Sequence, residues 1–295
     1  MTQSRANLLL LFAGLIWGLG FVAQSTAMAN LSPLTFIGLR FIVATLAVAP
    51  LALLETKRAT TPLRAADYKA FMILGLMLVS GMILQQTGLL TTSVTNAGFL
   101  TGLYVVLVPI LGVILFSQWP HPIVWICAII SLTGIWMLSG GSLNGFSKGD
   151  WLMIAGAFFW ALQGLFIARY ALRIGRPVTM ACIQFAVVAI VGLGLALIFE
   201  TIEWPAIKAA APEVLFTGVF SSGIAFTLQA IGTRYTSAPQ AAIFLSSEAL
   251  FAALFGAIIL GERLPSIGLA GCALIFASML MVEIVPRLRF KKAPA

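Results

Sequence analysis

The chain consists of long apolar runs separated by short polar gaps. A helix that crosses a bilayer needs roughly 20 apolar residues, and ten runs are close to that length. They cover about residues 6–29, 33–54, 68–90, 94–117, 121–139, 150–171, 177–199, 212–233, 238–260 and 265–285. Gaps as short as 30–32 and 91–93 force consecutive helices to run antiparallel. The pattern predicts an all-α membrane protein with ten transmembrane helices and no soluble domain.

The composition agrees with a chain that is surrounded mostly by lipid. Hydrophobic residues make up 61% of the 295 positions and charged residues 9%, whereas soluble proteins carry about 25% charged residues. The net charge of +8 would suggest nucleic acid if the basic residues formed a patch, but they are scattered through the gaps. We therefore expect a lipid bilayer as the partner of this surface, and no nucleic acid.

The basic residues predict the orientation, because cytoplasmic loops carry an excess of Lys and Arg. With the N-terminus inside, the cytoplasmic side holds Arg5, Lys57, Arg58, Arg64, Lys69, Arg169, Arg173, Arg176, Arg234, Arg287, Arg289, Lys291 and Lys292. The outer side holds only Lys148, Lys208 and Arg263, and Arg40 lies within a span. We therefore expect cytoplasmic N- and C-termini, the latter as a short basic tail.

The second half of the chain repeats the first at an offset of 144 residues. Twins at this offset include Pro33 and Pro177, Phe41 and Phe185, Gln85 and Gln229, Asn96 and Gln240, and Gly112 and Gly256. A shift of one residue pairs Trp17 with Trp160. Each half, 1–143 and 144–295, holds five predicted spans, and an odd number makes the halves enter the membrane in opposite senses. The repeat predicts two inverted five-helix repeats, an arrangement typical of transporters.

Ten spans in two repeats resemble the drug/metabolite transporter superfamily, specifically its EamA-type bacterial exporters. The resemblance covers nearly the whole chain and is carried by residues 13–18, 33–41 and 247–264, of which the last stretch matches most specifically. The first repeat departs from the second at Tyr104 and Gln118, where the second has Glu248 and Glu262, and Ala249 replaces a frequent proline. The size and the aromatic-rich spans are also similar to amino-acid exporters of the YddG type.

The resemblance implies a secondary transporter of the bacterial inner membrane that works by alternating access. The sequence lacks a GxxxxGK[ST] loop, so ATP is not its direct drive. An intramembrane enzyme would need a nucleophile–base set or metal ligands within the spans, but the only histidine, His121, lies in a gap and the cysteines lack metal-site spacing. We expect no catalytic residue, metal or cofactor, and a monomer that suffices for function.

Inverted repeats place a substrate near the bilayer midplane, so candidate ligands are polar or aromatic residues deep in the spans. Trp17 and Trp160 lie about ten residues into their helices, away from the interfacial aromatic belts; they either pack helices or wall a cavity. Gln163, one turn from Trp160, suits a ligand or a neighbouring helix. Gln85 and Gln229 need partners because a buried unpaired amide is costly, so they either join helices or line a wet cavity.

Glu248 lies midway along the ninth predicted span, where a charge costs about 2.5–3.5 kcal/mol on insertion scales. It should face the bundle interior, where it couples protons, anchors a substrate amino group or locks helices together. Arg40 lies nearer the outer end of its span, so it can snorkel, pair with Glu248, hold a substrate carboxylate or satisfy helix ends. Tyr104 and Ser246 are weaker candidates on the fourth and ninth spans.

These candidates are rich in rings and amides and carry few charges, which suits a small amphiphilic molecule. A sugar phosphate would need several buried cations, and only Arg40 is available. Our first hypothesis is therefore export of amino acids, including aromatic or apolar ones. The alternatives are efflux of drugs or other metabolites, where Glu248 would suit a hydrophobic cation, or a channel-like facilitator.

Overall fold

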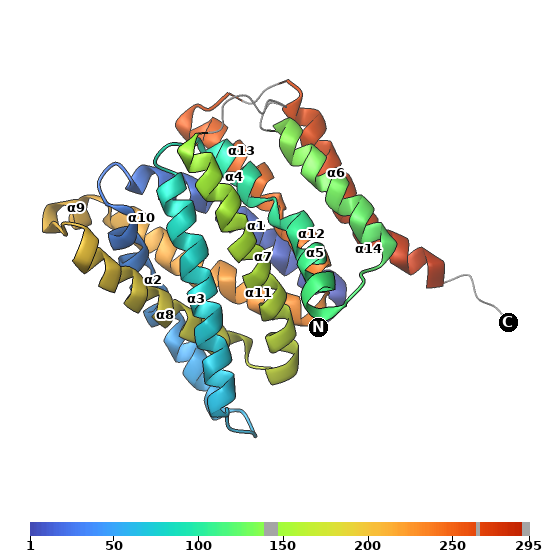
Figure 1. The fold of residues 1–295 in the computed structure, drawn as a ribbon, viewed down its shortest axis with the longest axis horizontal. Helices are drawn as coiled ribbons and strands as arrows, with labels where there is room; N and C mark the ends of the chain where they lie inside the picture. The colour runs from blue at the N-terminus through green and yellow to red at the C-terminus, as the bar shows by residue number, and fades with distance from the viewer. Residues whose placement is uncertain (139–146, 264–265, 291–295) are drawn as a thin grey trace.

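The structure is a computed structural model that describes residues 1–138, 147–263 and 266–290. Every regular element in these residues is helical (Figure 1). The elements are α1 (Gln3–Ala27), α2 (Pro33–Lys57), α3 (Ala65–Gly88), α4 (Val94–Thr101), α5 (Tyr104–Phe116), α6 (Pro122–Leu138), α7 (Lys148–Ile174), α8 (Pro177–Phe199), α9 (Trp204–Ala209), α10 (Ala211–Phe216), the π-helix η1 (Thr217–Phe226), α11 (Thr227–Gly232), the 3₁₀ helix η2 (Thr233–Tyr235), α12 (Ala238–Leu245), α13 (Ser247–Leu260) and α14 (Gly268–Phe290).

Nine helical segments within the described residues are long and apolar enough to cross a membrane. Three of them are composite: α4 with α5, α10 through η2, and α12 with α13. The fifth predicted span differs, because α6 has 17 residues and therefore a length of about 25 Å, less than the roughly 30 Å hydrocarbon core. The number of ten spans stays a prediction. The predicted repeat boundary at 143/144 and Lys291 and Lys292 of the basic tail lie outside the described residues.

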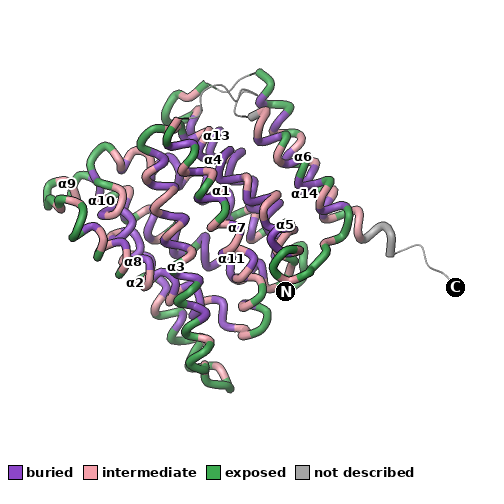
Figure 2. The backbone as a smooth tube through the Cα atoms, in the orientation of Figure 1, coloured by how far each residue is buried: buried purple, intermediate pink, exposed green. Residues whose placement is uncertain are grey.

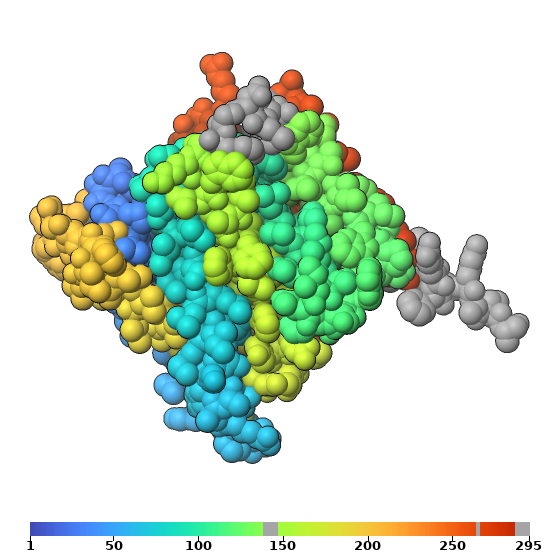
Figure 3. Space-filling view, in the orientation of Figure 1, coloured from blue at the N-terminus to red at the C-terminus, as the bar shows by residue number. Residues whose placement is uncertain are grey.

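Helix α1 lies inside the bundle, against α4, η1, α11, α12 and α13. Helix α2 packs along α8, α3 along α7, and α6 along α14 at one edge of the molecule (Figure 1). Figure 2 shows buried positions concentrated in the middle of the bundle, and Figure 3 shows α3, α7, α5 and α6 forming one face. Gly14 and Gly18 let α1 approach α13, because a Cβ at either would collide with Ser247 or Phe251.

The fourth and ninth predicted spans, expected as continuous helices, are interrupted at twin positions. The first interruption lies at Gly102–Leu103 and the second at Ser246, and 246 − 102 gives the repeat offset of 144. Beyond both, backbone N–H groups bond to carbonyls three residues back instead of four. The Ser246 hydroxyl also donates to the Ile243 carbonyl at 2.7 Å, which competes with the helical ladder.

The eighth predicted span, expected as a uniform α-helix, contains the 10-residue π-helix η1. In a π-helix each backbone N–H bonds to the carbonyl five residues earlier, and such turns are frequent at functional sites. The wider turn carries Ser221 and Phe226, both of which face the interior of the bundle. The interruptions therefore gather in the segments that surround the middle of the molecule.

Among the described residues, three helix N-termini are closed by a glutamate at the end of another helix, an arrangement we call a glutamate clamp. Glu200, directly after α8, accepts from two first-turn N–H groups of α2 at 2.9 and 2.7 Å and from the Thr35 hydroxyl at 2.8 Å. Glu55 of α2 accepts from two first-turn N–H groups of α8 at 3.2 and 2.7 Å and from the Thr179 hydroxyl at 2.7 Å. Because helix N-termini carry unpaired donors and positive partial charge, α2 and α8 stabilise each other.

The third clamp joins α13 to α4. Glu262, just after α13, accepts from the N–H groups of Val94 and Thr95 at 3.0 and 3.1 Å and from the Thr95 hydroxyl. Each clamp thus places a carboxylate against two N–H donors and one threonine. Charge-assisted hydrogen bonds of this kind are about twice as strong as neutral ones.

We predict that Glu200→Gln lowers the melting temperature of the detergent-purified protein by a few degrees, because the α2 clamp loses its charge. Hydrogen bonds to charged groups contribute about 1.5–3 kcal/mol, and Glu200 is half-buried. Glu203→Gln is the matched control, since Glu203 is exposed and makes no capping hydrogen bond with its side chain. Equal melting shifts in both variants would show that the clamp does not stabilise the helix pair.

Candidate functional site

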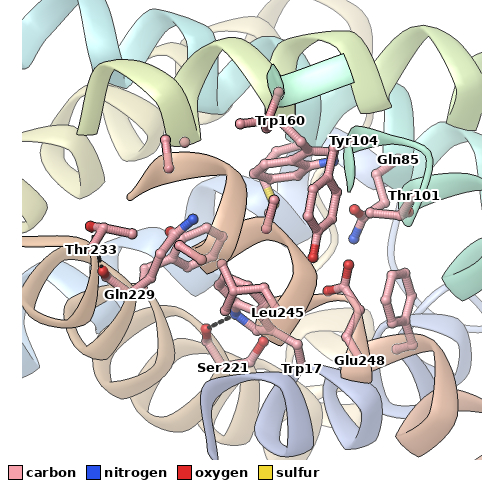
Figure 4. Close-up of a pocket in the computed structure, with 18 of the residues that line it drawn as sticks. Trp17, Gln85, Thr101, Tyr104, Trp160, Ser221, Gln229, Thr233, Leu245 and Glu248 are labelled. Atoms are coloured by element: carbon pink, nitrogen blue, oxygen red, sulfur yellow. Dashed lines mark hydrogen bonds between the residues drawn. The ribbon is translucent and has the colours of Figure 1, made fainter. Parts of the chain in front are cut away.

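A cavity lies in the middle of the bundle, with about 620 Å³ of empty space when its open side is included. Concave, mostly apolar sites with a few polar groups are the usual places where proteins bind small molecules. Both helix interruptions contribute to its wall, the first through Thr101 and Tyr104 and the second through Leu245 and Glu248 (Figure 4). The broken segments therefore bring side chains from both halves of the chain to one cavity.

One wall of the cavity is aromatic and centred on Phe226 of η1. The Phe226 ring lies 4.7 Å from the Trp17 ring and is stacked with the Trp160 ring at 5.9 Å, measured between centroids. Phe41 and Phe185 lie 6.5 and 6.2 Å from it and 5.8 Å from each other. The structure thus brings the two tryptophans, predicted as cavity walls or packing residues, to the same ring.

Five buried polar atoms of the cavity residues have no partner within hydrogen-bond distance among the described residues: Thr101 Oγ1, Tyr104 Oη, Trp160 Nε1, Gln229 Oε1 and Glu248 Oε1. The Tyr104 hydroxyl and the Glu248 carboxyl are neighbours that interact with each other. Figure 4 shows the Tyr104 hydroxyl and the Glu248 carboxyl pointing toward each other across the cavity. Buried polar groups are nearly always paired in folded proteins. These atoms therefore form a set of donors and acceptors that a polar ligand or water can satisfy.

Arg40 lines the cavity but its guanidinium is already bound. Its Nε donates to Ser222 Oγ at 2.6 Å, Nη1 to Gln24 Oε1 at 2.7 Å and Nη2 to Ser221 Oγ at 3.1 Å. Of the four alternatives for Arg40, snorkelling does not fit the structure: the side chain is 1% exposed, because these neutral partners satisfy it inside the bundle. No carboxylate of the described residues, Glu248 included, lies within ion-pair distance of it.

Gln24 of α1 extends this cluster to α3. Its Oε1 also accepts from Gln85 Nε2 at 3.2 Å, and its backbone carbonyl accepts from Gln86 Nε2 at 3.2 Å. Gln24 and Gln85 each lie three residues before the ends of α1 and α3. The cluster of Arg40, Gln24, Gln85, Gln86, Ser221 and Ser222, which we call the Arg40 network, therefore bounds the cavity toward that end of the bundle.

The cavity extends in the opposite direction, toward the end where the chain begins. Helix α1 runs antiparallel to η1 and α11, since Gly20 lies against Ser221 and Leu10 against Gly232. The cavity wall reaches Thr233, the residue after Gly232, and Ala238 at the start of α12. Its two ends therefore differ: one is bounded by the Arg40 network and the other reaches the α12 N-terminus.

Two predicted site residues lie outside the cavity wall. Gln163 of α7 donates to Gln184 of α8 at 3.0 Å, and the Ser246 hydroxyl lies 3.0 Å from that of Ser131 on α6. Neither contributes to the wall. Gln163 bonds to a neighbouring helix, which was one of its two alternatives, and Ser246, predicted as a weaker site candidate, contacts α6. The remaining predicted residues, Trp17, Trp160, Gln85, Gln229, Tyr104, Glu248 and Arg40, all line the cavity.

Several wall residues were missed. Thr101 lies one turn before Tyr104, and that spacing was a usable signal. Gln24 has no polar twin, since the offset of 143 that pairs Trp17 with Trp160 places Ile167 at its repeat position, so the repeat could not find it. Ser221 and Phe226 depend on the π-helix, which local sequence does not predict. In the part of the chain that the structure describes, no group of three or more His, Cys, Asp or Glu side chains could hold a metal.

Comparison with known proteins identifies the family. The model of the EamA-like transporter family matches residues 4–140 and again 147–284. An uncharacterized transporter of Archaeoglobus fulgidus is 30% identical over 279 residues, which are 95% of this chain and 86% of that protein. The uncharacterized transporter YwfM of Bacillus subtilis is 24% identical over 292 residues, 95% of this chain and 94% of that protein.

The fold has a counterpart among solved structures. A crystal structure of a protein with 18% sequence identity superposes with a TM-score of 0.76, covering 96% of this chain and 98% of that one. At this identity the likeness concerns the fold alone. Together with the two family matches and the apolar helices, it leads to one conclusion: the chain belongs to the EamA-like transporter family and is a multi-pass membrane transporter.

Proposed function

We propose that this chain is a secondary transporter that moves small amphiphilic molecules through the central cavity by alternating access. The observation that carries the proposal is the combination of an aromatic wall with five buried polar atoms that lack partners among the described residues. A mostly apolar pocket with a few convergent polar groups is the usual form of a small-molecule site. The rings suit an apolar body and the polar atoms suit its head group.

The proposal includes ten spans in two inverted five-helix repeats, 1–143 and 144–295, with both termini cytoplasmic. The two successive family matches, the twin interruptions at Gly102 and Ser246, and the contact between the twin rings of Phe41 and Phe185 support it. The proposal also includes export across a bacterial inner membrane, as the resemblance to EamA-type exporters implies. It includes a monomer, because one chain surrounds the cavity.

Amino acids, including aromatic and apolar ones, are the first substrate class. An amino group suits the Glu248 carboxyl beside the Tyr104 hydroxyl, and an aromatic or aliphatic side chain suits Trp160 and Phe226. The substrate carboxylate would then meet neutral donors, such as Trp160 Nε1 and the Thr101 hydroxyl.

Efflux of hydrophobic cations is the second candidate, and the Arg40 geometry favours it. Neutral side chains use three of the five N–H donors of that guanidinium, so only one N–H on Nη1 and one on Nη2 remain for a substrate carboxylate. The Glu248 Oε1 acceptor remains without a partner. The two candidates differ in one group of the ligand, which makes them directly separable.

Counterflow in proteoliposomes tests the proposed function. We expect vesicles loaded with unlabelled phenylalanine to accumulate labelled phenylalanine against its gradient, because a carrier exchanges substrates through one cavity. Phenethylamine, which keeps the ring and amine but lacks the carboxylate, is the matched compound. Accumulation of the amine alone would select the second candidate. Ion currents without counterflow of either compound would contradict a carrier and favour a channel.

Glu248→Gln should raise the half-saturating concentration for both amines by about 10- to 100-fold, because a charge-assisted hydrogen bond contributes about 1.5–3 kcal/mol. Concentration-dependent counterflow measures the change. Glu203→Gln serves as the control, since it removes a carboxylate from an exposed position outside the spans. Unchanged concentration dependence in Glu248→Gln would remove this residue as the anchor.

The two tryptophans should respond differently to replacement by phenylalanine. Trp17 Nε1 donates to the Ser221 carbonyl at 2.9 Å, so Trp17→Phe removes a buried hydrogen bond that contributes about 0.5–1.5 kcal/mol and lowers the melting temperature. Trp160 Nε1 has no partner, so Trp160→Phe should leave stability unchanged and weaken substrate binding several-fold. Equal loss of stability in both variants would assign Trp160 to packing.

A further inference from the structure

The glutamate clamps occupy three of four positions that the repeat relates to one another. Helices α2 and α8 are twins, since 177 − 33 is 144, and each is clamped by the other's glutamate. Helices α4 and α12 are also twins, since 238 − 94 is 144. Helix α4 is clamped by Glu262. The residue at the corresponding position beside α12 is Gln118, since 262 − 118 is again 144.

The backbone presents Glu262 and Gln118 in the same way. Gly261, with φ 69°, caps the C-terminus of α13, and the Glu262 N–H donates to the Gly256 carbonyl at 3.1 Å. Ser117, with φ 52°, caps the C-terminus of α5, and the Gln118 N–H donates to the carbonyl of Gly112, the twin of Gly256, at 3.2 Å. Both ends are left-handed helix caps. We call the place where the end of α13 meets the start of α4 the α4–α13 corner, and its repeat twin, where the end of α5 meets the start of α12, the α5–α12 corner. The two corners therefore differ in side chains and not in local chain geometry.

The corner at α12 is not clamped. Gln118 is exposed, and its side chain makes no hydrogen bond to α12 within the described ranges. Where α4 begins with Val94–Thr95, α12 begins with Ala238–Pro239, and proline offers neither an N–H nor a hydroxyl. This corner lacks the carboxylate and two of the three donors that a clamp uses.

The unclamped corner coincides with one end of the cavity. Ala238 and Ala241 of α12 line the cavity. Ala238 is half-buried whereas its twin Val94 is 1% exposed. Ala241 and its twin Ala97 are both buried, but only Ala241 lines the cavity. Gln240 of α12 donates to Glu283 of α14 at 3.2 Å and accepts from Gln3 of α1 at 2.7 Å. The α12 N-terminus thus packs against α5 without a glutamate clamp, and its side-chain hydrogen bonds go to α1 and α14.

We infer that Glu262 is a positioning residue of the transport cycle, whose clamp keeps the α4–α13 corner shut while the α5–α12 corner gives access to the cavity. The inference rests on the proposed alternating access. In an inverted repeat, the second access state exchanges the roles of the two halves, so the Glu262 clamp opens when the α12 corner closes. Gln118 and Pro239 cannot form the equivalent clamp, which biases the protein toward the state open at α12.

Paired cysteine reporters test this inference on the purified full chain in detergent. Ala241→Cys and Ala97→Cys are made separately in a background where Cys127, Cys182 and Cys272 are alanine, and their reaction rates with a bulky, charged maleimide are measured. We expect Ala241→Cys to react much faster than Ala97→Cys. Adding Glu262→Gln should speed the reaction at position 97 and slow it at position 241, each by about tenfold if the two access states shift from about 10:1 to about 1:10.

Matched variants separate gating from general loosening. Glu55→Gln opens a clamp in the α2–α8 pair, so it should not exchange the two rates. Gly256→Ala provides a second route if Glu262→Gln does not fold, because its Cβ would lie 2.9 Å from Glu262 Oε2, whereas the nearest atom to a Cβ at Gly112 is 3.7 Å away. Gly256→Ala should therefore act like Glu262→Gln, and Gly112→Ala should not.

A fourth clamp can also be built. Gln118→Glu combined with Pro239→Thr restores the carboxylate and both missing donors, so it should slow labelling at position 241. Unchanged rates in the Glu262→Gln and Gly256→Ala variants, or a parallel rise at both positions, would overturn the inference. Labelling requires no substrate, so reciprocal rate changes in a protein that fails counterflow would support the gate and reject the proposed substrates.

Discussion

Lipid offers no hydrogen bonds, so every polar group inside the bilayer must find its partner within the protein. The glutamate clamps meet this requirement at helix N-termini, where the unpaired N–H donors bind carboxylates from neighbouring helices. The Arg40 network meets it for a buried cation by surrounding the guanidinium with amide and hydroxyl oxygens. Against this background the unpartnered atoms of the cavity stand out, because the same rule makes them costly unless a ligand or water completes them.

Repeat twins of the same residue type differ in their hydrogen-bond partners, and these differences make the two sides of the cavity unequal. Trp17 donates to a backbone carbonyl whereas the Trp160 indole N–H has no partner. Gln85 donates to Gln24, whereas the side-chain oxygen of its twin Gln229 is left free in the wall. One member of each pair thus serves the structure and the other can serve a ligand.

The apolar runs predicted most of the helices, because a helix surrounded by lipid needs a run of apolar residues. The repeat pointed to Trp17, Trp160, Gln85 and Gln229. Tertiary contacts decided the rest. The partners of Arg40 could not be predicted, because Ser221 and Ser222 lie on a π-helix about 180 residues away, and local sequence does not reveal that wider turn.

In the gating that we infer, the clamps divide the bundle into a fixed pair, α2 with α8, and a moving pair, α4 with α12. Helices α2 and α8 hold each other at both ends, so relative movement would break two sets of charge-assisted hydrogen bonds at once. Of the twin helices α4 and α12, only α4 has a glutamate clamp among the described residues. Both helices belong to segments that are interrupted at mid-span. An interruption lets the half-helix beyond it tilt without disturbing the other half, as in transporters with broken helices. Since Tyr104 and Glu248 lie just past these interruptions, movement of α4 or α12 would change the space around the site where we place the substrate.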